Sequence, residues 1–355
     1  MSAMDHPVDL TGPQATWPAA GLRLWREATD HVLGLPDSWH PPPLQGDRGL
    51  REVLGVILDE NPDDVLVTSG VRAGASVMAR TARSFSHEQP SFTGTVAVLR
   101  SCRREVNLQS WAELLDLRRH GGRTGSAGVI WLTDPWRNPD GATLTLDDWS
   151  RVAAVAQTHQ VVVNEVYRWF GKAASRPAHV WMTGSLSKLA GSGAGLGWIR
   201  GTGMDGLARR QHARPSLFWQ RCWAYFLAHG GLELLIDHTV LPTAEASRAF
   251  LDELVRVAGT EYCPDAVAGS PFLLLPVPHA TTNEFVSRLA TEGYRVGPGD
   301  DFLARSPSVR VCFVGVSDAD ARRAARTIGT RLLADASFKA ESHRAEGRTG
   351  GGARH

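Results

Sequence analysis

Short apolar runs alternate with longer helical stretches in the first two-thirds of this chain, and this alternation constrains the fold more than any other feature. The runs are rich in Val, Ile and Trp and lie at 64–70, 95–100, 127–135, 160–167, 178–184 and 195–201. The stretches at 70–85, 110–122 and 145–160 instead carry apolar residues at helical intervals. Continuous apolar strands separated by helices predict a mostly parallel sheet that is covered by helices on both faces.

After residue 215 the pattern changes to one that predicts a smaller α+β domain. Helical stretches at 215–229 and 242–259 precede strand-like runs at 270–278, 294–302 and 309–316 and helical stretches at 281–293 and 317–336. We therefore predict a large domain over 45–235 and a small domain that combines 1–44 with 236–335. We expect the polar, glycine-rich segment 336–355 to be a disordered tail.

Composition argues against several classes of protein. The 38 Lys and Arg residues nearly balance the 37 Asp and Glu residues, so the net charge of +1 favours neither a nucleic acid nor a membrane as partner. The amino terminus has no basic start and apolar run of a secretory signal, and no stretch approaches the roughly 18 apolar residues of a membrane span. The four cysteines are scattered and the 13 histidines form no HExxH cluster, so we expect reduced thiols, a cytoplasmic protein and no metal site.

The use of lysine is unusual. Only three of the 38 basic residues are lysines, namely Lys172, Lys188 and Lys339. Arginine cannot give up its proton to become a nucleophile, whereas a desolvated lysine can. Lys188 follows a buried strand in "GSLSK" and precedes a run of glycines. This context indicates covalent chemistry at Lys188.

Polar residues follow several of the predicted strands at the point where each strand ends. Asn138 follows one strand, Asn164 and Tyr167 end a second, and "SLSK" follows a third. Ligands of open parallel sheets bind beyond the carboxyl ends of the strands, so we expect these residues to share one site. A fourth strand turns into a helix at 69–70, where backbone N–H groups and the helix dipole can hold a phosphate.

The order of these motifs resembles that of the fold-type I pyridoxal-phosphate (PLP) enzymes, specifically the class I/II aminotransferase family. The motifs are "TSGVRAG" (68–74), "PSF" (90–92), "NPDG" (138–141), "NEVY" (164–167), "SLSK" (185–188) and "SPSVRVCF" (306–313). The resemblance spans roughly residues 40 to 330. It implies the PLP-dependent transferase fold, with a mostly parallel seven-stranded sheet between helices in the large domain, a smaller α+β domain, and a homodimer whose sites lie at the subunit boundary.

The same resemblance implies a role for each matching residue. The residues that it assigns to the cofactor are Ser69, Gly70, Phe92, Asn138, Asn164, Tyr167, Ser185 and Lys188. Lys188 would form the Schiff base and then move the α-proton of the substrate. Asn138 and Tyr167 would hydrogen-bond the phenolic oxygen, Phe92 would stack on the ring, and the two serines with Gly70 would bind the phosphate. Arg310 would pair with a substrate carboxylate.

Three features depart from the family pattern. Asn164 stands where most members place an aspartate against the pyridine nitrogen. Glu165 should face the other side of its strand, so it should not replace the aspartate unless the strand bulges. The arginine expected about eight residues beyond the lysine is absent from "LAGSGAGLG" (189–197), so either a backbone nest or Arg72 must hold the phosphate. The tyrosine that family members lend to the neighbouring subunit is missing from 40–52.

Several functions and several simpler interpretations remain open at this stage. Transamination of an amino acid is the reaction that the resemblance implies, and the loss of the aspartate makes a decarboxylase, a lyase or an oxidase of specialised metabolism credible alternatives. A non-catalytic relative that binds a ligand in the same crevice is a further alternative. The simpler interpretations are a surface lysine at 188, core aromatic residues at 92 and 167, a turn asparagine at 138 and a structural ion pair at 310.

Overall fold

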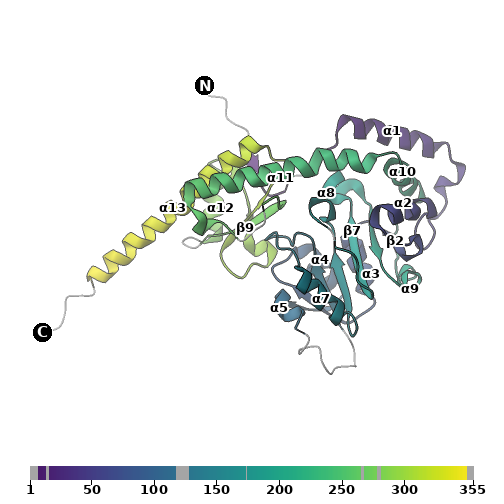
Figure 1. The fold of residues 1–355 in the computed structure, drawn as a ribbon, viewed down its shortest axis with the longest axis horizontal. Coiled ribbons are helices and arrows are strands. Elements are labelled where there is room, and N and C mark those ends of the chain that lie inside the picture. Colours follow the sequence, from purple (N-terminus) through teal and green to yellow (C-terminus); the bar gives the residue numbers. More distant parts are fainter. Residues whose placement is uncertain are drawn as a thin grey trace. The chain divides into compact units, whose positions relative to one another are not determined.

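The protein is described by a computed structural model that covers residues 7–12, 16–116, 128–172, 174–264, 268–277 and 281–349, with side chains described through residue 335. The chain forms two compact units. A large unit contains residues 14–138 and 142–241, and a small unit contains residues 1–13, 139–141 and 242–355. Figure 1 colours both units along the sequence.

A seven-stranded sheet forms the centre of the large unit, with the strand order β2-β8-β7-β6-β5-β3-β4. In that order the strands are β2 (Val65–Thr68), β8 (Gly197–Arg200), β7 (Val180–Ser185), β6 (Gln160–Asn164), β5 (Val129–Thr133), β3 (Ser84–Glu88) and β4 (Glu105–Gln109). The pairs from β7 to β4 are parallel, and β8 alone runs antiparallel to its neighbours β7 and β2. This topology confirms the predicted mostly parallel sheet of seven strands.

Successive residues of the central strands point to opposite faces, and helices bury both faces. In β5, Trp131 contributes to one apolar cluster, which includes residues of α3 and α4, whereas Ile130 and Leu132 contribute to another, which includes residues of α7. Both faces of the sheet therefore need apolar residues, which is why the strands appear in the sequence as continuous apolar runs. Figure 1 shows the helices around the sheet.

The helices that belong to the large unit follow the strands in the expected alternation. They are α1 (Ala19–Leu33), α2 (Arg48–Leu58), α3 (Val71–Met78), α4 (Thr93–Ser101), α5 (Trp111–Leu114), α7 (Leu146–Val155), α8 (Ser187–Ala190), α9 (Met204–Ala208) and α10 (Leu217–Ala228). Single turns of 3-10 helix are η1 (Pro36–Trp39), η2 (Pro62–Asp64), η3 (Arg168–Phe170) and η4 (Ser192–Ala194). The helix α11 (Gly231–Ala258) includes residues of both units.

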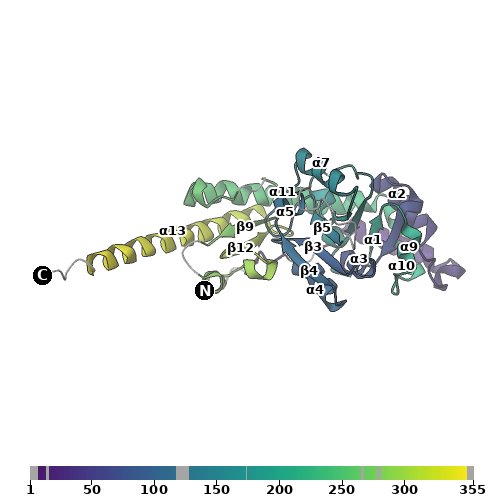
Figure 2. The same ribbon diagram turned by 90° about the horizontal axis from the view of Figure 1, so that it is seen from below.

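One of the six apolar runs is a helix instead of a strand. Residues 95–100 lie in α4, where Val96 and Leu99 are buried three positions apart, as on one face of a helix. The sequence does not predict the neighbouring strands β3 and β4, because their residues, SFSHE and EVNLQ, are largely polar. Figure 2 shows β3, β4 and β5 side by side, and the ladder pairs confirm their contact.

The amino-terminal helix belongs to the large unit, so the prediction that groups residues 1–44 with the small domain is wrong for this helix. An aromatic cluster explains the difference. Trp25 lies 5.0 Å from Trp219 and 4.8 Å from Trp223, measured between ring centroids, and Trp17 lies 5.2 Å from Phe226. We call these five side chains the tryptophan cluster. Burying such large rings on α10 fixes α1 in the large unit.

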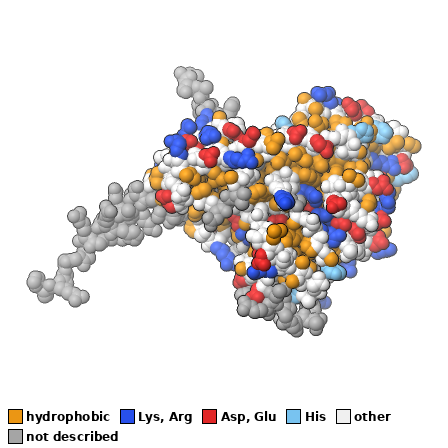
Figure 3. Space-filling model, viewed as in Figure 1, with side chains coloured by type: hydrophobic (Ala, Val, Ile, Leu, Met, Phe, Trp, Pro, Cys, Tyr) orange, Lys and Arg blue, Asp and Glu red, His pale blue; other side chains and the backbone are white. Residues whose placement is uncertain are grey.

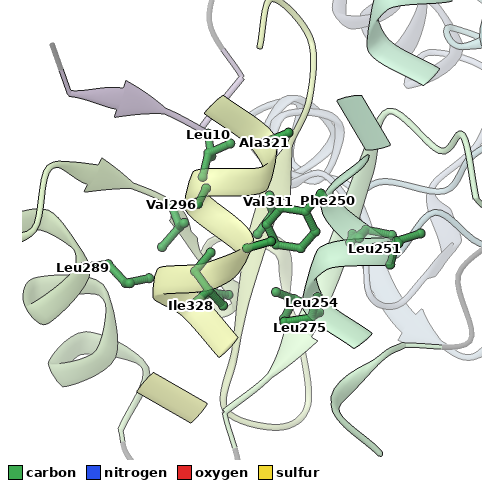
Figure 4. Close-up of a cluster of buried hydrophobic side chains, with 14 of the residues drawn as sticks. Leu10, Phe250, Leu251, Leu254, Leu275, Leu289, Val296, Val311, Ala321 and Ile328 are labelled. Atoms are coloured by element: carbon green, nitrogen blue, oxygen red, sulfur yellow. The ribbon is translucent and has the colours of Figure 1, made fainter. Parts of the chain in front are cut away.

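The small unit is built around a three-stranded antiparallel sheet, ordered β11-β12-β9. Its strands are β9 (Phe272–Pro276), β11 (Gly297–Pro298) and β12 (Ser308–Cys312), and a separate parallel pair joins β1 (Val8–Asp9) to β10 (Tyr294–Arg295). Its helices are α12 (Thr282–Thr291), α13 (Asp318–Thr349), η5 (Thr260–Tyr262) and η6 (Gly299–Phe302). Phe250, Val311 and Ile328 point into its apolar core (Figure 4). The helix α13 continues to Thr349, past the start of the tail expected at 336, and residues 350–355 lie outside the described residues.

Basic and acidic side chains are interspersed over the face shown in Figure 3. None of the described helices is long and apolar enough to cross a membrane. Within the same residues, no group of three His, Cys, Asp or Glu side chains is placed to hold a metal ion.

Glu88, at the end of β3, is a fully buried carboxyl that links β5 to α5. One of its oxygens accepts hydrogen bonds from the Thr133 N–H at 2.9 Å and from the Trp111 indole N–H at 2.7 Å. The other oxygen has no hydrogen-bond partner in the described part of the chain. Burial raises the pKa of Glu88 to about 7, and burial also lowers the pKa of its neighbour His87 to about 4.

We predict that Glu88→Gln becomes more stable relative to the wild type as the pH rises. The folded pKa of Glu88 lies above its ordinary value of 4.5, so its contribution to stability is complete below about pH 4.5 and is lost as the pH rises through about 7. Glutamine cannot ionise and retains an acceptor for Thr133. The free energy of unfolding of each protein is measured by urea unfolding at about pH 5 and at about pH 8. The value for the variant minus that for the wild type should be roughly 1–3 kcal/mol larger at about pH 8 than at about pH 5. A difference that does not change with pH would contradict this assignment.

Candidate active site

A cavity of about 460 Å³ opens at the edge of the large-unit sheet where β2, β5, β6 and β7 end. All the residues that line it belong to the large unit. The structure brings together there every residue that the sequence assigned to the cofactor: Ser69, Gly70, Phe92, Asn138, Asn164, Tyr167, Ser185 and Lys188. Its volume lies within the range of small-molecule sites in proteins.

Lys188 is held in the cavity by the turn that follows β7. The strand ends at Ser185, and the short helix α8 begins two residues later. The Lys188 Nζ atom lies 5.5 Å from the centroid of the Tyr167 ring, and that tyrosine is itself only 3% exposed. The side chain of Lys188 is half-buried. This placement disfavours the simpler interpretation of a surface lysine.

The residues expected at the phosphate surround the start of α3. Gly70 precedes this helix with φ +129°, and no side chain caps the first turn, so its N–H groups remain available. A Cβ atom at Gly70 would lie 3.6 Å from Ser185 Oγ, so glycine keeps this part of the cavity open. Ser185 Oγ donates to the Leu196 carbonyl at 3.0 Å and accepts from the Ser187 N–H at 3.0 Å, which fixes its position.

Asn138 lines the cavity and has a buried polar atom without a hydrogen-bond partner in the described part of the chain. The residue is 8% exposed, and its Oδ1 atom has no hydrogen-bond partner among the described residues. A buried amide without a partner is costly, so such a group in a cavity wall indicates a ligand that completes its hydrogen bonds. The residue therefore fits a bound molecule better than a simple turn.

Asn164 and Glu165 point in opposite directions, as expected from the alternation along β6. Asn164 lines the cavity and its Oδ1 accepts from the Val166 N–H at 3.2 Å. Glu165 is fully buried away from the cavity and accepts a hydrogen bond from the Trp198 indole at 2.8 Å. Arg200 binds both of its oxygens at 2.9 Å. Glu165 is therefore committed to this network and points away from the cavity, as the alternation along the strand predicts.

The basic residues of the cavity are few. Arg72 and Lys188 are the only arginine and lysine side chains among the described residues that line it. Arg72 is exposed and its guanidinium carbon lies 5.5 Å from the centroid of the Phe92 ring. The segment 189–197, which lacks the expected arginine, contributes Ser192 and Gly195 to the lining.

Arg310 lies in the small unit and is 6% exposed. Its guanidinium donates to the Thr11 carbonyl at 3.0 Å, and its carbon lies 5.1 Å from the Phe272 ring centroid and 4.8 Å from that of Phe302. No carboxylate of the described residues pairs with it. The interpretation of Arg310 as a structural ion pair is therefore not supported, and a buried guanidinium without a carboxylate is suited to binding an anion.

Sequence reasoning missed part of the cavity wall. Thr133 is the last residue of β5, within the apolar run at 127–135, and Ser187 is the second serine of "SLSK". Neither residue was assigned to the site from the sequence. The position of Thr133 at a strand end was a signal that could have identified it. Thr95 and Val166 also line the cavity, but their sequence context gives no signal.

Comparisons with known proteins identify the family. The family model for aminotransferase class I and II matches residues 50–328. Among solved structures, the chain resembles the α-aminoadipate aminotransferase LysN of Thermus thermophilus, with a TM-score of 0.79, 18% identity and 94% of each chain covered. It also resembles the multiple substrate aminotransferase of Thermococcus profundus, with a TM-score of 0.77 and 16% identity. This match covers 95% of the present chain and 93% of the Thermococcus chain.

A Thermus thermophilus aspartate aminotransferase double mutant gives a TM-score of 0.75, with 18% identity and 92% of each chain covered. A search of curated proteins returned no match. At such low identities the structural likeness establishes the fold, and the family model, which matches well over half of the chain, establishes the membership. The chain belongs to the class I and II aminotransferases, the pyridoxal-phosphate-dependent enzymes of fold type I.

Proposed function

We propose that this protein is an aminotransferase that acts at the α-carbon of an amino acid and uses Lys188 as the amine that binds PLP. The observation that carries this proposal is the position of Lys188 in a cavity lined by every cofactor residue expected from the sequence. When bound, PLP supplies an aldehyde that condenses with amines and a ring that withdraws electrons from the α-carbon.

Lys188 is suited to two tasks at the α-carbon. Its Nζ atom can hold the cofactor until a substrate amine replaces it, and it is then positioned to take and return the α-proton. The Tyr167 ring, 5.5 Å from Nζ, limits the positions that this flexible side chain can occupy. Water is partly excluded because the lysine is half-buried.

The other lining residues orient the ring of the cofactor. The amide of Asn138 and the hydroxyl of Tyr167 are suited to the phenolic oxygen, and Phe92 offers an apolar face to the ring. Asn164 accepts a hydrogen bond from Val166 through Oδ1, so its Nδ2 group is suited to donate to the pyridine nitrogen. An amide cannot stabilise a positive charge there, so we expect slower α-proton removal than with a carboxylate.

The family match favours transamination over the decarboxylase, lyase and oxidase alternatives. The lysine in the cavity disfavours a non-catalytic binding protein. For substrate recognition we infer that Arg310 binds the carboxylate of the amino acid. Family membership also supports a homodimer, and the four free cysteines support a cytoplasmic protein.

Replacement of Lys188 by arginine should abolish the visible absorbance of lysine-bound PLP, because a guanidinium cannot condense with the aldehyde. We expect transamination to fall by roughly 10³-fold or more as the proton-transfer group is also lost. Lys172→Arg is the matched control, since Lys172 is exposed and does not line the cavity. Unchanged absorbance in the Lys188 variant would refute the assignment.

Replacement of Asn164 by aspartate should increase the rate of α-proton exchange, measured by NMR in deuterated water. Aspartate keeps the acceptor for the Val166 N–H and adds a charge that holds a proton on the ring nitrogen. An increase of about tenfold corresponds to about 1.4 kcal/mol. Asn164→Ala, which adds no charge, should not increase the rate. Equal effects of both changes would mean that residue 164 does not act on the ring.

Replacement of Arg310 by glutamine should raise KM for an α-amino acid by roughly 10- to 100-fold, because a charge-assisted hydrogen bond is lost. The absorbance of lysine-bound PLP should remain. A primary amine that lacks the carboxylate should react equally with the variant and with the wild type. If both substrates are affected alike, Arg310 has a structural role instead.

A further inference from the structure

We propose that the segment 189–197 binds the phosphate of PLP through backbone N–H groups, and that three indoles of the tryptophan cluster hold these groups in position. The inference rests on the proposed function, since it takes the cavity to be the PLP site. It assigns a positioning role to Trp17, Trp219 and Trp223, which lie far from Lys188 in the sequence.

The backbone at the end of this segment has the conformation of an anion-binding nest. Ala194 ends the 3-10 turn η4, and Gly195 follows in the left-handed region with φ +56° and ψ +24°. A right-handed residue followed by a left-handed one directs successive N–H groups toward one concave point. The N–H groups of Gly195 and Leu196 have no protein acceptor among the described residues, and Gly195 lines the cavity.

Indole groups fix the peptide planes of the segment. The Ala194 carbonyl accepts hydrogen bonds from the Trp219 indole at 2.7 Å and from the Trp223 indole at 3.0 Å. In a trans peptide the carbonyl and the following N–H point in opposite directions. The two indoles therefore direct the Gly195 N–H away from the tryptophan cluster. The Trp17 indole binds the Ala190 carbonyl in the same way at 2.9 Å, which fixes the Gly191 N–H.

The backbone conformation at position 195, where the segment contacts Trp219, favours glycine. A Cβ atom at position 195 would lie 3.4 Å from Trp219 Nε1, and the positive φ already disfavours any other residue. On its other side the segment is tied to Ser185, whose hydroxyl donates to the Leu196 carbonyl. Hydrogen bonds therefore connect Ser185, a serine expected at the phosphate, to the part of the segment that carries the N–H groups of Gly195 and Leu196.

This arrangement explains how the site can lack the family's arginine. Neutral N–H groups bind a phosphate well when they are fixed and when a helix N-terminus adds its positive end, here that of α3. Arg72 lies beside Phe92, the residue expected at the ring, and not in this segment. We therefore expect the indole-fixed N–H groups to provide most of the preference for a phosphorylated cofactor.

The test compares the affinity of the cofactor-free full chain for PLP with its affinity for pyridoxal, which lacks the phosphate. Fluorescence titration of Trp219→Phe combined with Trp223→Phe should show PLP binding weakened by about tenfold or more, with pyridoxal binding nearly unchanged. Phenylalanine keeps an aromatic ring but removes the N–H donor. Trp25→Phe is the matched control, because Trp25 packs in the same cluster but donates no hydrogen bond to the described residues of the segment. It should keep the wild-type ratio of affinities.

Other outcomes separate the two proposals. An unchanged ratio of the two affinities would overturn the inference. If both affinities are weakened equally, the tryptophans only stabilise the fold. Arg72→Leu should retain most of the preference for PLP; if it removes all of the preference, the charge of Arg72 holds the phosphate and the inference fails. A wild-type protein that binds neither compound would overturn the proposed function itself. Thermal unfolding of each variant checks that it is folded.

Discussion

The shared edge at which four strands of one sheet end is the constraint on which the site depends. Because β2, β5, β6 and β7 point the same way, the residues that follow them meet although they are up to 119 positions apart, from Ser69 to Lys188. Burial of both faces of the sheet holds these ends in register. The cavity therefore depends on the sheet, and each functional side chain needs only its own strand and turn to reach it.

A second theme of the site is the replacement of charges by fixed neutral groups. In the proposed site Asn164 would take the place of a carboxylate, and the nest proposed at Gly195 would take the place of an arginine. Both groups are held by hydrogen bonds from elsewhere in the large unit, Asn164 by the Val166 N–H and the nest by indoles. The nearest carboxylate along the strand, Glu165, is bound by Arg200 and is not available to the cavity. If both proposals hold, the amide at the ring and the amides at the phosphate give a site with less charge than the family pattern implies.

Much of the fold and of the cavity could be predicted because both leave local signals. The runs that form β2, β5, β6, β7 and β8 are apolar on both faces, and the motif residues stand directly after them. The strands β3 and β4 leave no such signal because their sequences are largely polar, and residues 95–100 have an apolar spacing that also suits a helix, as in α4. Contacts between tryptophans and residues more than 20 positions away place α1 in the large unit. Contacts of the same kind hold the segment 189–197 in position. No local pattern encodes such contacts.

The central claim is that one lysine of this chain binds the cofactor. Borohydride reduction of the PLP-loaded protein, followed by peptide mapping by mass spectrometry, tests it most directly. The account predicts a single phosphopyridoxyl label on the peptide that contains Lys188. A label on Lys172 or Lys339, or no label after saturation with PLP, would contradict it.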